Sequence, residues 1–194
     1  MVDVVFSAAG LLVLSPVLLA IALAIKLDSP GPVFFRQTRV GRGGAEFRIH
    51  KFRTMVHRPE AAGPALTVGE DRRITRVGRW LRDRRIDELA QLIDVLRGTM
   101  SLVGPRPEVP HYVAHYPPAL RDKVLSVRPG ITDPASLAFR DEATLLARAA
   151  DPEREYIEVV LPAKLALAAD YVDHAGTWRD LQVIWRSLWV LAGR

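Results

Sequence analysis

The sequence predicts an α-rich α/β protein that is associated with a membrane through its N-terminal segment. Three observations predict this class. Residues 4–25 carry no charge, two short strand patterns flank a glycine-rich loop at 41–44, and helical patterns fill the C-terminal half. The chain has 194 residues and is 49% hydrophobic, which fits a folded protein and excludes intrinsic disorder. It has no cysteine, so disulfide scaffolds, cysteine-ligated metals and thiol catalysis are excluded.

The uncharged segment is long enough to cross a bilayer. As a helix, its length of about 33 Å matches the hydrocarbon thickness of roughly 30 Å. A buried soluble helix is rarely apolar on every face in so small a domain. A secretory signal would begin with a positive charge, whereas the first charged residue here is Asp3. A straight transmembrane helix and a re-entrant helix are the two remaining interpretations.

Ser15 and Pro16 lie in the middle of this segment. Proline removes a backbone N–H and clashes with the carbonyl of Leu12, so we expect the helix to bend. The Ser15 hydroxyl can satisfy a freed carbonyl inside lipid. The basic residues that follow place the C-terminal side of the segment in the cytoplasm. We therefore predict a re-entrant membrane helix over residues 1–27, with a simple span as the alternative, and a second region over residues 28–194.

A strongly basic segment follows the apolar one. Residues 36–85 hold 14 Lys and Arg against 5 Asp and Glu, a local net charge of +9 in a chain of +5. Nucleic acid, anionic lipid headgroups and a phosphorylated substrate all suit this excess. The adjoining bilayer-length segment and the lack of a nucleic-acid-binding motif argue against nucleic acid. A basic stretch beside a membrane fits the two remaining ligands, the phosphates of lipid headgroups and the phosphate of a substrate.

The basic segment contains two predicted strands, at 33–36 and 46–53, which the loop 41–44 joins into a small β-hairpin. Alternation along the second strand places Lys51 and Arg53 on the face that also carries its apolar residues. Two cations at the end of an apolar face suit an anionic ligand. Exposure of both side chains to water at the strand end is the alternative.

Asp87 and Glu88 open a predicted helix that ends at Gly98. Leucine and isoleucine at positions 89, 92, 93 and 96 share one face of this helix. Acidic residues are common in a first turn because they stabilise helix N-termini. Arginines at 82, 84 and 85 directly precede the pair, however, and a proline-rich turn follows the helix. These surroundings make Asp87 and Glu88 candidates for chemistry.

Two prolines flank Arg106 and fix its backbone, which suits a guanidinium aimed at a phosphate. An exposed arginine in a proline-rich connector is the alternative. With no buried partner, Arg106→Lys is expected to leave the stability unchanged. Arg128 precedes a second turn of the same kind, Pro129-Gly130.

The C-terminal third is predicted to be helical, as several amphipathic surface helices at 141–150, 152–172 and 178–191, with Pro162 bending the second of them. The last helix carries tryptophan, leucine and isoleucine on one face, at positions 178, 181, 184, 185 and 188. Such a face is either packed in the core or rests on a bilayer.

Taken together, these motifs resemble the bacterial sugar transferase family, the monotopic phosphoglycosyl transferases that begin glycan assembly on a polyprenol phosphate. The resemblance runs from about residue 3 to residue 188. Its landmarks are Ser15-Pro16, 29–32 (SPGP), 35–37 (FRQ), 39–41 (RVG), 51–55 (KFRTM), 75–78 (TRVG), 87–92 (DELAQL), 100–107 (MSLVGPRP), 128–132 (RPGIT) and 180–181 (DL).

The resemblance implies a cytoplasmic-face catalytic domain over residues 28–194 at the bacterial inner membrane. The implied reaction transfers a sugar-1-phosphate from a nucleotide-diphosphate sugar, a UDP-sugar, to undecaprenyl phosphate and releases the nucleoside monophosphate. By the same resemblance, Asp87 is the nucleophile of a covalent aspartyl-phosphosugar intermediate and Glu88 is its partner. The family's cofactor is Mg2+, which would lie near Asp87 and Glu88. This reaction is the first membrane step of exopolysaccharide, O-antigen, capsule or glycoprotein assembly.

The cations expected to meet the substrate phosphates are Lys51, Arg53, Arg106, Arg128 and Arg140, the last lying where family members carry an arginine. The expected partners are the nucleotide-sugar donor, the polyprenol phosphate acceptor and membrane lipid, without nucleic acid. Whether the chain forms a homodimer stays open.

The sequence departs from the family pattern after the second turn. Many members have Gly-Trp-Ala-Gln there, whereas residues 133–136 read DPAS, and this leaves the sugar open. The alternative function is a non-catalytic membrane-surface protein that binds anionic lipid or an acidic partner. The acidic pair beside the proline-flanked arginine distinguishes the two, because lipid binding needs neither feature.

Overall fold

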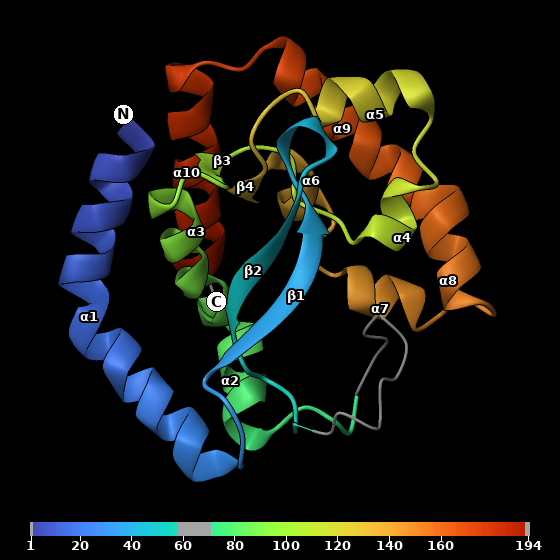
Figure 1. Cartoon of the computed structure of the whole chain (residues 1–194). Coiled ribbons are helices and arrows are strands. Elements are labelled where there is room, and N and C mark those ends of the chain that lie inside the picture. The colour runs from blue at the N-terminus through green and yellow to red at the C-terminus, as the bar shows by residue number, and fades with distance from the viewer. Residues whose placement is uncertain (1, 58–70, 193–194) are drawn as a thin grey trace.

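The computed structural model of the chain describes residues 2–57 and 71–192 (Figure 1). Its helices are α1 (Val2–Asp28), α2 (Arg76–Asp83), α3 (Leu92–Leu96), α4 (Pro110–Val113), α5 (Pro118–Val124), α6 (Pro134–Ala138), α7 (Glu142–Leu146), α8 (Pro152–Glu155), α9 (Leu161–Asp173) and α10 (Thr177–Ala192). Two 3-10 turns, η1 (Arg42–Gly44) and η2 (Ile86–Gln91), and a π turn, η3 (Tyr156–Val160), accompany them. The strands are β1 (Phe34–Val40), β2 (Glu46–Phe52), β3 (Ser101–Val103) and β4 (Gly130–Thr132). The α-rich class with a small sheet is confirmed.

The predicted apolar segment forms one long helix, α1, with Pro16 inside it. The Ser15 hydroxyl donates a hydrogen bond to the Leu12 carbonyl at 2.7 Å, as expected from the sequence. Figure 1 shows the axis of α1 changing direction about half way along. Among the described residues this helix alone is long and apolar enough to cross a membrane, and only 11% of its apolar window is buried. Its re-entrant path through a bilayer stays a prediction.

Both ends of α1 contact the same folded body. Near the start, Asp3 accepts a hydrogen bond from the Ser101 hydroxyl at 2.8 Å, and the buried Ser7 hydroxyl donates to the Leu92 carbonyl at 2.5 Å. At the other end, Asp28 accepts from the backbone N–H of Val77 at 3.0 Å. The middle of the helix therefore leans away from the body while its two ends are held.

The predicted hairpin is confirmed, with a longer first strand than expected. β1 extends to Val40 and pairs antiparallel with β2 along its whole length, from Phe34 opposite Phe52 to Val40 opposite Glu46. The strand predicted at 33–36 was too short because the residues after it are polar and carry no strand pattern. They are nevertheless in β1 because β2 continues beside them and pairs with their backbone. The turn uses Gly43 and Gly44 with φ of 67° and 80°, which glycine adopts without strain.

The two proline–glycine turns lie side by side because β3 and β4 pair in parallel, with Ser101 opposite Gly130 and Val103 opposite Thr132. The backbones approach so closely that a side chain at Gly130 would place its Cβ 2.1 Å from the Gly104 nitrogen. Glycine is therefore required there. This pairing was not predicted, since strands of three residues carry little periodic signal.

The helices of the C-terminal third are shorter and more broken than predicted. The region expected as one helix at 141–150 gives only α7, and 152–172 is divided into α8, η3 and α9. Pro162 has no N–H to donate to the carbonyl of Glu158, and the chain forms the π turn η3 directly before it. Asp151 caps α8 as its sequence predicts, by accepting from the backbone of Glu153 and Arg154.

The interpretation of the last helix as a core stripe is wrong. On α10, Trp178, Trp185 and Trp189 are 66–74% exposed, and among its described side chains only Val183 is buried. The helix contacts the rest of the fold through Val183 and the partly buried Ile184, next to β3 and β4. Its apolar face is thus left uncovered in the described part of the chain.

Candidate active site

Asp87 and Glu88 lie in the 3-10 turn η2, which begins after Arg85 in the left-handed conformation with φ of 52°. Both carboxylate residues are buried, at 3% and 8% exposure. The predicted α-helix from Asp87 to Gly98 is therefore wrong in its first half, since only Leu92–Leu96 is α-helical. A 3-10 turn has three residues per turn, so the buried face shifts from the predicted one. The buried residues of η2 and α3 are Asp87, Glu88, Ala90, Gln91, Leu92, Asp94 and Val95, so Leu92 alone of the predicted apolar face at 89, 92, 93 and 96 is buried.

Lys51 connects the two carboxylates. Its Nζ lies 3.0 Å from Asp87 Oδ2 and 3.1 Å from Glu88 Oε1. The lysine reaches them because the end of β2 packs against η2. The anions that Lys51 meets here belong to the protein, and its predicted role at a substrate phosphate stays a prediction.

Arg106 also holds Glu88, and it shares the oxygen Oε1 with Lys51. Its Nη2 donates to Glu88 Oε1 at 2.5 Å and its Nη1 donates to Oε2 at 3.1 Å, a two-point contact that matches the geometry of a guanidinium. Glu88 therefore pairs with two cations. Within residues 2–57 and 71–192, Asp87 pairs with Lys51 alone.

These contacts keep Glu88 ionised. Burial by itself would raise the pKa of the Glu88 carboxyl, but the charges of Arg106 and Lys51 and the hydrogen bonds from Arg106 outweigh it. The pKa of Glu88 therefore lies well below its usual range. The same ion pair raises the pKa of the Arg106 guanidinium.

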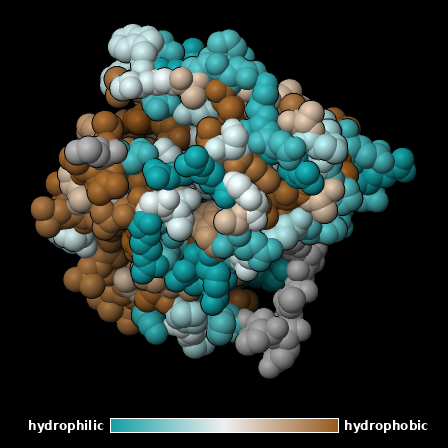
Figure 2. All heavy atoms as spheres, turned by 45° about the horizontal axis from the view of Figure 1, so that its top comes forward, coloured by the Kyte–Doolittle hydropathy of each residue, from teal (hydrophilic) through white to brown (hydrophobic). Residues whose placement is uncertain are grey.

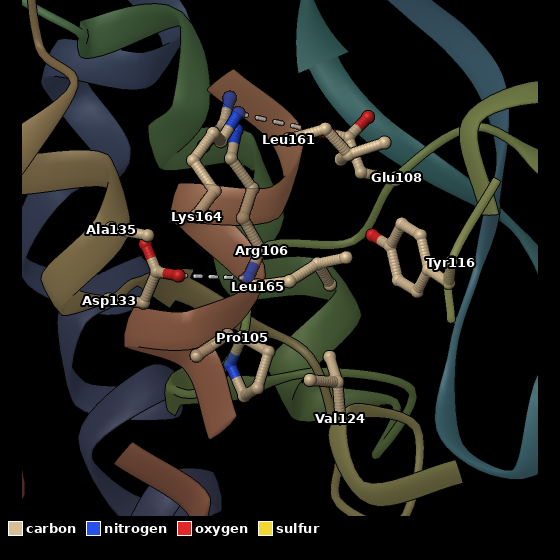
Figure 3. Close-up of a pocket in the computed structure, with 11 residues that line it drawn as sticks. Pro105, Arg106, Glu108, Tyr116, Val124, Asp133, Ala135, Leu161, Lys164 and Leu165 are labelled. Carbon is tan, nitrogen blue, oxygen red and sulfur yellow. Dashed lines mark hydrogen bonds and ion pairs between the residues drawn. The ribbon is translucent and has the colours of Figure 1, made fainter. Parts of the chain in front are cut away.

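The backbone of Arg106 is held by Asp133, the first residue at which the sequence departs from the family pattern. Asp133 is 1% exposed, and its Oδ2 accepts from the Arg106 backbone N–H at 3.2 Å. Its Oδ1 accepts from the Ser136 N–H at 2.7 Å and so caps α6. One buried carboxylate thus connects the proline-flanked turn to the next helix (Figure 3).

A second buried carboxylate, Glu108, lies two residues beyond Arg106. Together with Asp133, these residues line a small cavity (Figure 3). Glu108 accepts from the Tyr156 hydroxyl at 2.6 Å and pairs with Lys164 at 3.5 Å and with Arg39 at 3.4 Å. Burial raises the pKa of Glu108, but Lys164 and Arg39 lower it further than burial raises it. Sequence reasoning missed this network, because its members are far apart in the chain.

Arg53 does not join the cluster that the sequence analysis assigned it to. It is 4% exposed, and its guanidinium donates to the carbonyls of Ile25, Ser29 and Pro30 at 2.6–3.1 Å. These are the last free carbonyls of α1 and the turn after it, so Arg53 caps the membrane-length helix. Its proposed role as a phosphate ligand is corrected to a structural one, since all these acceptors belong to the backbone.

Arg128 and Arg140 are both exposed. The Arg140 carbonyl accepts from Arg85 Nη2 at 3.3 Å, and the Arg140 side chain lines the same groove as Arg85 and Glu88. Arg128 lies on the turn before β4, and its backbone packs against Gly104. The structure therefore brings Lys51 and Arg106 into contact with the acidic pair. Arg140 shares a groove wall with Glu88 and pairs with Asp141, and Arg128 stays at the periphery.

The donor set at Asp87 and Glu88 fits Mg²⁺. This ion prefers oxygen ligands and is commonly bound through one or two carboxylates, with water and substrate phosphate completing its shell. In the structure the cation beside these carboxylates is Lys51, whose Nζ lies within 3.1 Å of both. In the described part of the chain, no group of three or more His, Asp or Glu side chains is arranged as a metal cage.

Comparison with known proteins identifies the family. The chain matches the family described as bacterial sugar transferase over residues 1–194, and it belongs to that family. A UDP-glucose:undecaprenyl-phosphate glucose-1-phosphate transferase of Caulobacter vibrioides is 41% identical over 197 residues, covering 96% of this chain and 66% of the relative.

Two further relatives differ in the sugar that their names give. A UDP-N-acetylgalactosamine-undecaprenyl-phosphate N-acetylgalactosaminephosphotransferase of Aeromonas hydrophila is 36% identical, covering 96% of this chain and 41% of the relative. A UDP-glucose:undecaprenyl-phosphate glucose-1-phosphate transferase of Escherichia coli is also 36% identical, with 96% and 38% covered. The chain thus spans about two fifths to two thirds of the length of these relatives.

Proposed function

We propose that the chain is a phosphoglycosyl transferase that moves a sugar-1-phosphate from a UDP-sugar to undecaprenyl phosphate and releases UMP. The relatives' names supply the donor and acceptor classes. The observation that carries the proposal is the buried pair of carboxylates, Asp87 and Glu88, held between Lys51 and Arg106. A protein that only bound lipid phosphate would present these cations to solvent and would not neutralise them with buried acids.

Asp87 is the nucleophile in this proposal. Its carboxylate oxygen forms a bond to the sugar-bearing phosphorus while the bond from that phosphorus to the bridging oxygen breaks, and UMP leaves with the electron pair. An oxygen of undecaprenyl phosphate then attacks the same phosphorus, the aspartyl bond breaks, and the Asp87 carboxylate is restored. A carboxylate is ionised at neutral pH, so no general base is needed to activate it.

The unequal pairing of the two carboxylates supports this assignment. Both oxygens of Glu88 accept from Arg106, and one also contacts Lys51. Asp87 meets Lys51 through Oδ2. Glu88 is therefore fixed as a positioning residue, whereas Asp87 keeps an oxygen available for attack. Lys51 reduces the repulsion between the Asp87 anion and an anionic diphosphate.

Asp87 and Glu88 would hold Mg²⁺ together with the donor's diphosphate. When bound, the ion supplies charge neutralisation of the diphosphate and of the leaving UMP. The orientation of Glu88 comes from Arg106 and not from the metal, since the ion pair is already formed by the protein alone.

The location we propose is the cytoplasmic face of the bacterial inner membrane, with α1 re-entrant. Asp3, Ser7 and Asp28 attach the two ends of α1 to one folded body, and a helix crossing to the other side would separate them. The basic residues after α1 favour the cytoplasmic side. In this place the enzyme would begin assembly of a surface glycan such as an exopolysaccharide.

The decisive experiment measures UMP release by the purified chain in lipid nanodiscs, from UDP-glucose, UDP-N-acetylgalactosamine and UDP-galactose in turn, with Mg²⁺ and undecaprenyl phosphate. The expected result is acceptor-dependent turnover with at least one donor, and an undecaprenyl-diphosphate sugar by mass spectrometry. Omitting Mg²⁺ should abolish the release of UMP. Binding to anionic vesicles without UMP release from any nucleotide-sugar would support the non-catalytic alternative and overturn the proposal.

A further inference from the structure

An apolar groove runs between the first turns of α1 and the length of α10, with β3, β4 and α6 as its floor. Its volume is about 550 Å³, within the range of roughly 300–1,000 Å³ that is usual for ligand sites. Its walls are mainly hydrophobic and include Phe6, Leu89, Leu102, Leu137, Leu181 and Ile184. We call it the α1–α10 groove.

The α1–α10 groove reaches the candidate active site. Arg85, Glu88 and Arg140 line it together, so a carboxylate of the acidic pair is part of its wall. Arg85 and Arg140 are linked through the hydrogen bond from Arg85 Nη2 to the Arg140 carbonyl. A ligand in the groove would therefore have an apolar part against leucines and isoleucines, and an anionic end beside two guanidinium groups.

The groove also opens onto the surfaces that are left uncovered. On α1, Val2 and Phe6 line it and are each 62% exposed. On α10, Leu181 and Leu188 line it and are 51% and 55% exposed. Figure 2 shows apolar side chains gathered over the side of the molecule formed by α1. The groove is thus continuous with the surface expected to lie in lipid.

We propose that the α1–α10 groove holds the isoprene units nearest the phosphate of the polyprenol acceptor, with that phosphate directed toward Arg85 and Arg140. This assignment rests on the proposed function and adds the place where the acceptor binds. The charge distribution selects this occupant, because an apolar chain that ends in an anion matches both parts of the groove. The rest of the long chain would extend along α1 into the bilayer.

A second copy of the chain fits the groove less well. An apolar segment of protein would cover the leucines but would bring no anion to the end of the groove that Arg85 and Arg140 line. Arg140 Nε lies 3.6 Å from Asp141 Oδ2, so this end holds more positive charge than that single carboxylate offsets. A phospholipid carries a phosphate as well, so the test must separate polyprenyl phosphate from phospholipid.

The first test is photocrosslinking of the full chain in nanodiscs with a polyprenyl phosphate that carries a diazirine in its second isoprene unit. The expected labels fall on the peptides that line the groove, which are those of the first turns of α1, β3, α6 and α10. Excess undecaprenyl phosphate should remove them, whereas excess phosphatidylglycerol should not. Labels elsewhere, or equal competition by phosphatidylglycerol, would overturn the proposal. Because crosslinking needs no turnover, this result is independent of whether the chain proves to be a transferase.

The second test narrows the groove with Leu181→Trp and uses Leu145→Trp as its matched control, a leucine of similar exposure on α7 that does not line the groove. Displacing two buried methylenes should raise KM for undecaprenyl phosphate about tenfold. The burst of UMP formed without acceptor should stay unchanged, since it depends on the donor. Equal KM values for undecaprenyl phosphate in the two variants would contradict the groove as the acceptor site.

Discussion

Arg106 and Glu88 form a two-point ion pair in which both carboxylate oxygens accept from the guanidinium, at 2.5 and 3.1 Å. This contact gives the proline-flanked arginine a structural partner in addition to the phosphate role that the sequence predicts. The sequence suggested an exposed guanidinium aimed at a substrate phosphate, but the side chain is directed first at a buried acid of the protein. The two residues come from separate turns, so the pair also ties those turns together.

Arg106→Lys keeps the positive charge but cannot make both bonds. Loss of one charge-assisted hydrogen bond should slow turnover roughly ten- to a hundredfold. Because buried Glu88 then lacks a partner for one oxygen, stability should also fall, by about 1–3 kcal/mol. Thermal unfolding and UMP release check both effects, with exposed Arg148→Lys as the control. An unchanged melting temperature would return Arg106 to the role that the sequence suggested.

Asp87→Asn should remove the covalent step and leave the fold intact, because asparagine keeps the size of the side chain. Turnover is expected to fall to background, and no sugar-phosphate adduct should be found on the intact protein by mass spectrometry. Glu88→Gln should slow the reaction but still allow the adduct, since Asp87 remains. Asp122→Asn, a change at an exposed carboxylate, is the control. An adduct of normal yield on Asp87→Asn would exclude Asp87 as the nucleophile.

Asp133→Asn separates the two duties of the buried carboxylate at position 133. An asparagine caps a helix about as well as aspartate, so α6 should remain capped through the Ser136 N–H. The amide then has no second oxygen for the Arg106 N–H, and the turn loses its support. We expect a fall in kcat of several-fold with little change in KM for the donor. Asp133→Ala, which loses both bonds, should in addition lower the melting temperature.

Equal melting temperatures and equal kcat for Asp133→Asn and the unmodified chain would show that the bond to Arg106 has no positioning role. The comparison is informative because the resemblance to the bacterial sugar transferase family leads us to expect glycine at this place. In this chain the carboxylate supplies a contact that a glycine cannot make.

Glu108 makes stability depend on pH in the acid range. Its folded-state pKa lies below the unfolded value of about 4.3. The carboxylate therefore stabilises the fold above that pH, and this contribution is lost as pH falls through the folded-state pKa. Glu108→Gln should cost about 3 kcal/mol at pH 7, because the partly buried Arg39 loses its counter-ion and Lys164 keeps only Glu142.

The difference in unfolding free energy between Glu108→Gln and the unmodified chain should shrink as pH is lowered from about 5 to about 2. Taking the difference removes the contribution of carboxylates that titrate in both proteins. Urea unfolding at each pH in the same detergent measures it. A difference that stays constant over this range would show that Glu108 keeps its ordinary pKa in the folded chain.

Local signals in the sequence were sufficient for the apolar helix, the hairpin and the acidic pair, because each depends on neighbours within a few residues. Lys51 was also identified, since strand alternation places it at the end of an apolar face. The exposed face of α10 was misjudged because an apolar stripe looks the same whether protein or lipid covers it.

Long-range contacts were beyond the sequence. Arg53 was assigned to a phosphate because it shares a face with Lys51, whereas the carbonyls it meets belong to the end of α1, more than twenty residues earlier. Asp133 could be noticed only as a departure, because its bond to the Arg106 N–H joins two residues far apart in the chain, although its cap of α6 is a local contact. The Glu108 network likewise assembles from four separate elements of the fold.

The topology of α1 can be tested with single cysteines, because the chain has none of its own. Val2→Cys and Lys26→Cys place a thiol at each end of the helix. If Asp3, Ser7 and Asp28 hold both ends on one body, a membrane-impermeant maleimide should label both from the cytoplasmic side of inverted vesicles and neither from the outside of intact spheroplasts. Replacing Ser15 with leucine and Pro16 with alanine should straighten the helix and weaken the labelling of Val2→Cys in inverted vesicles. Labelling of the two cysteines from opposite sides in the otherwise unmodified chain would show that α1 spans the bilayer.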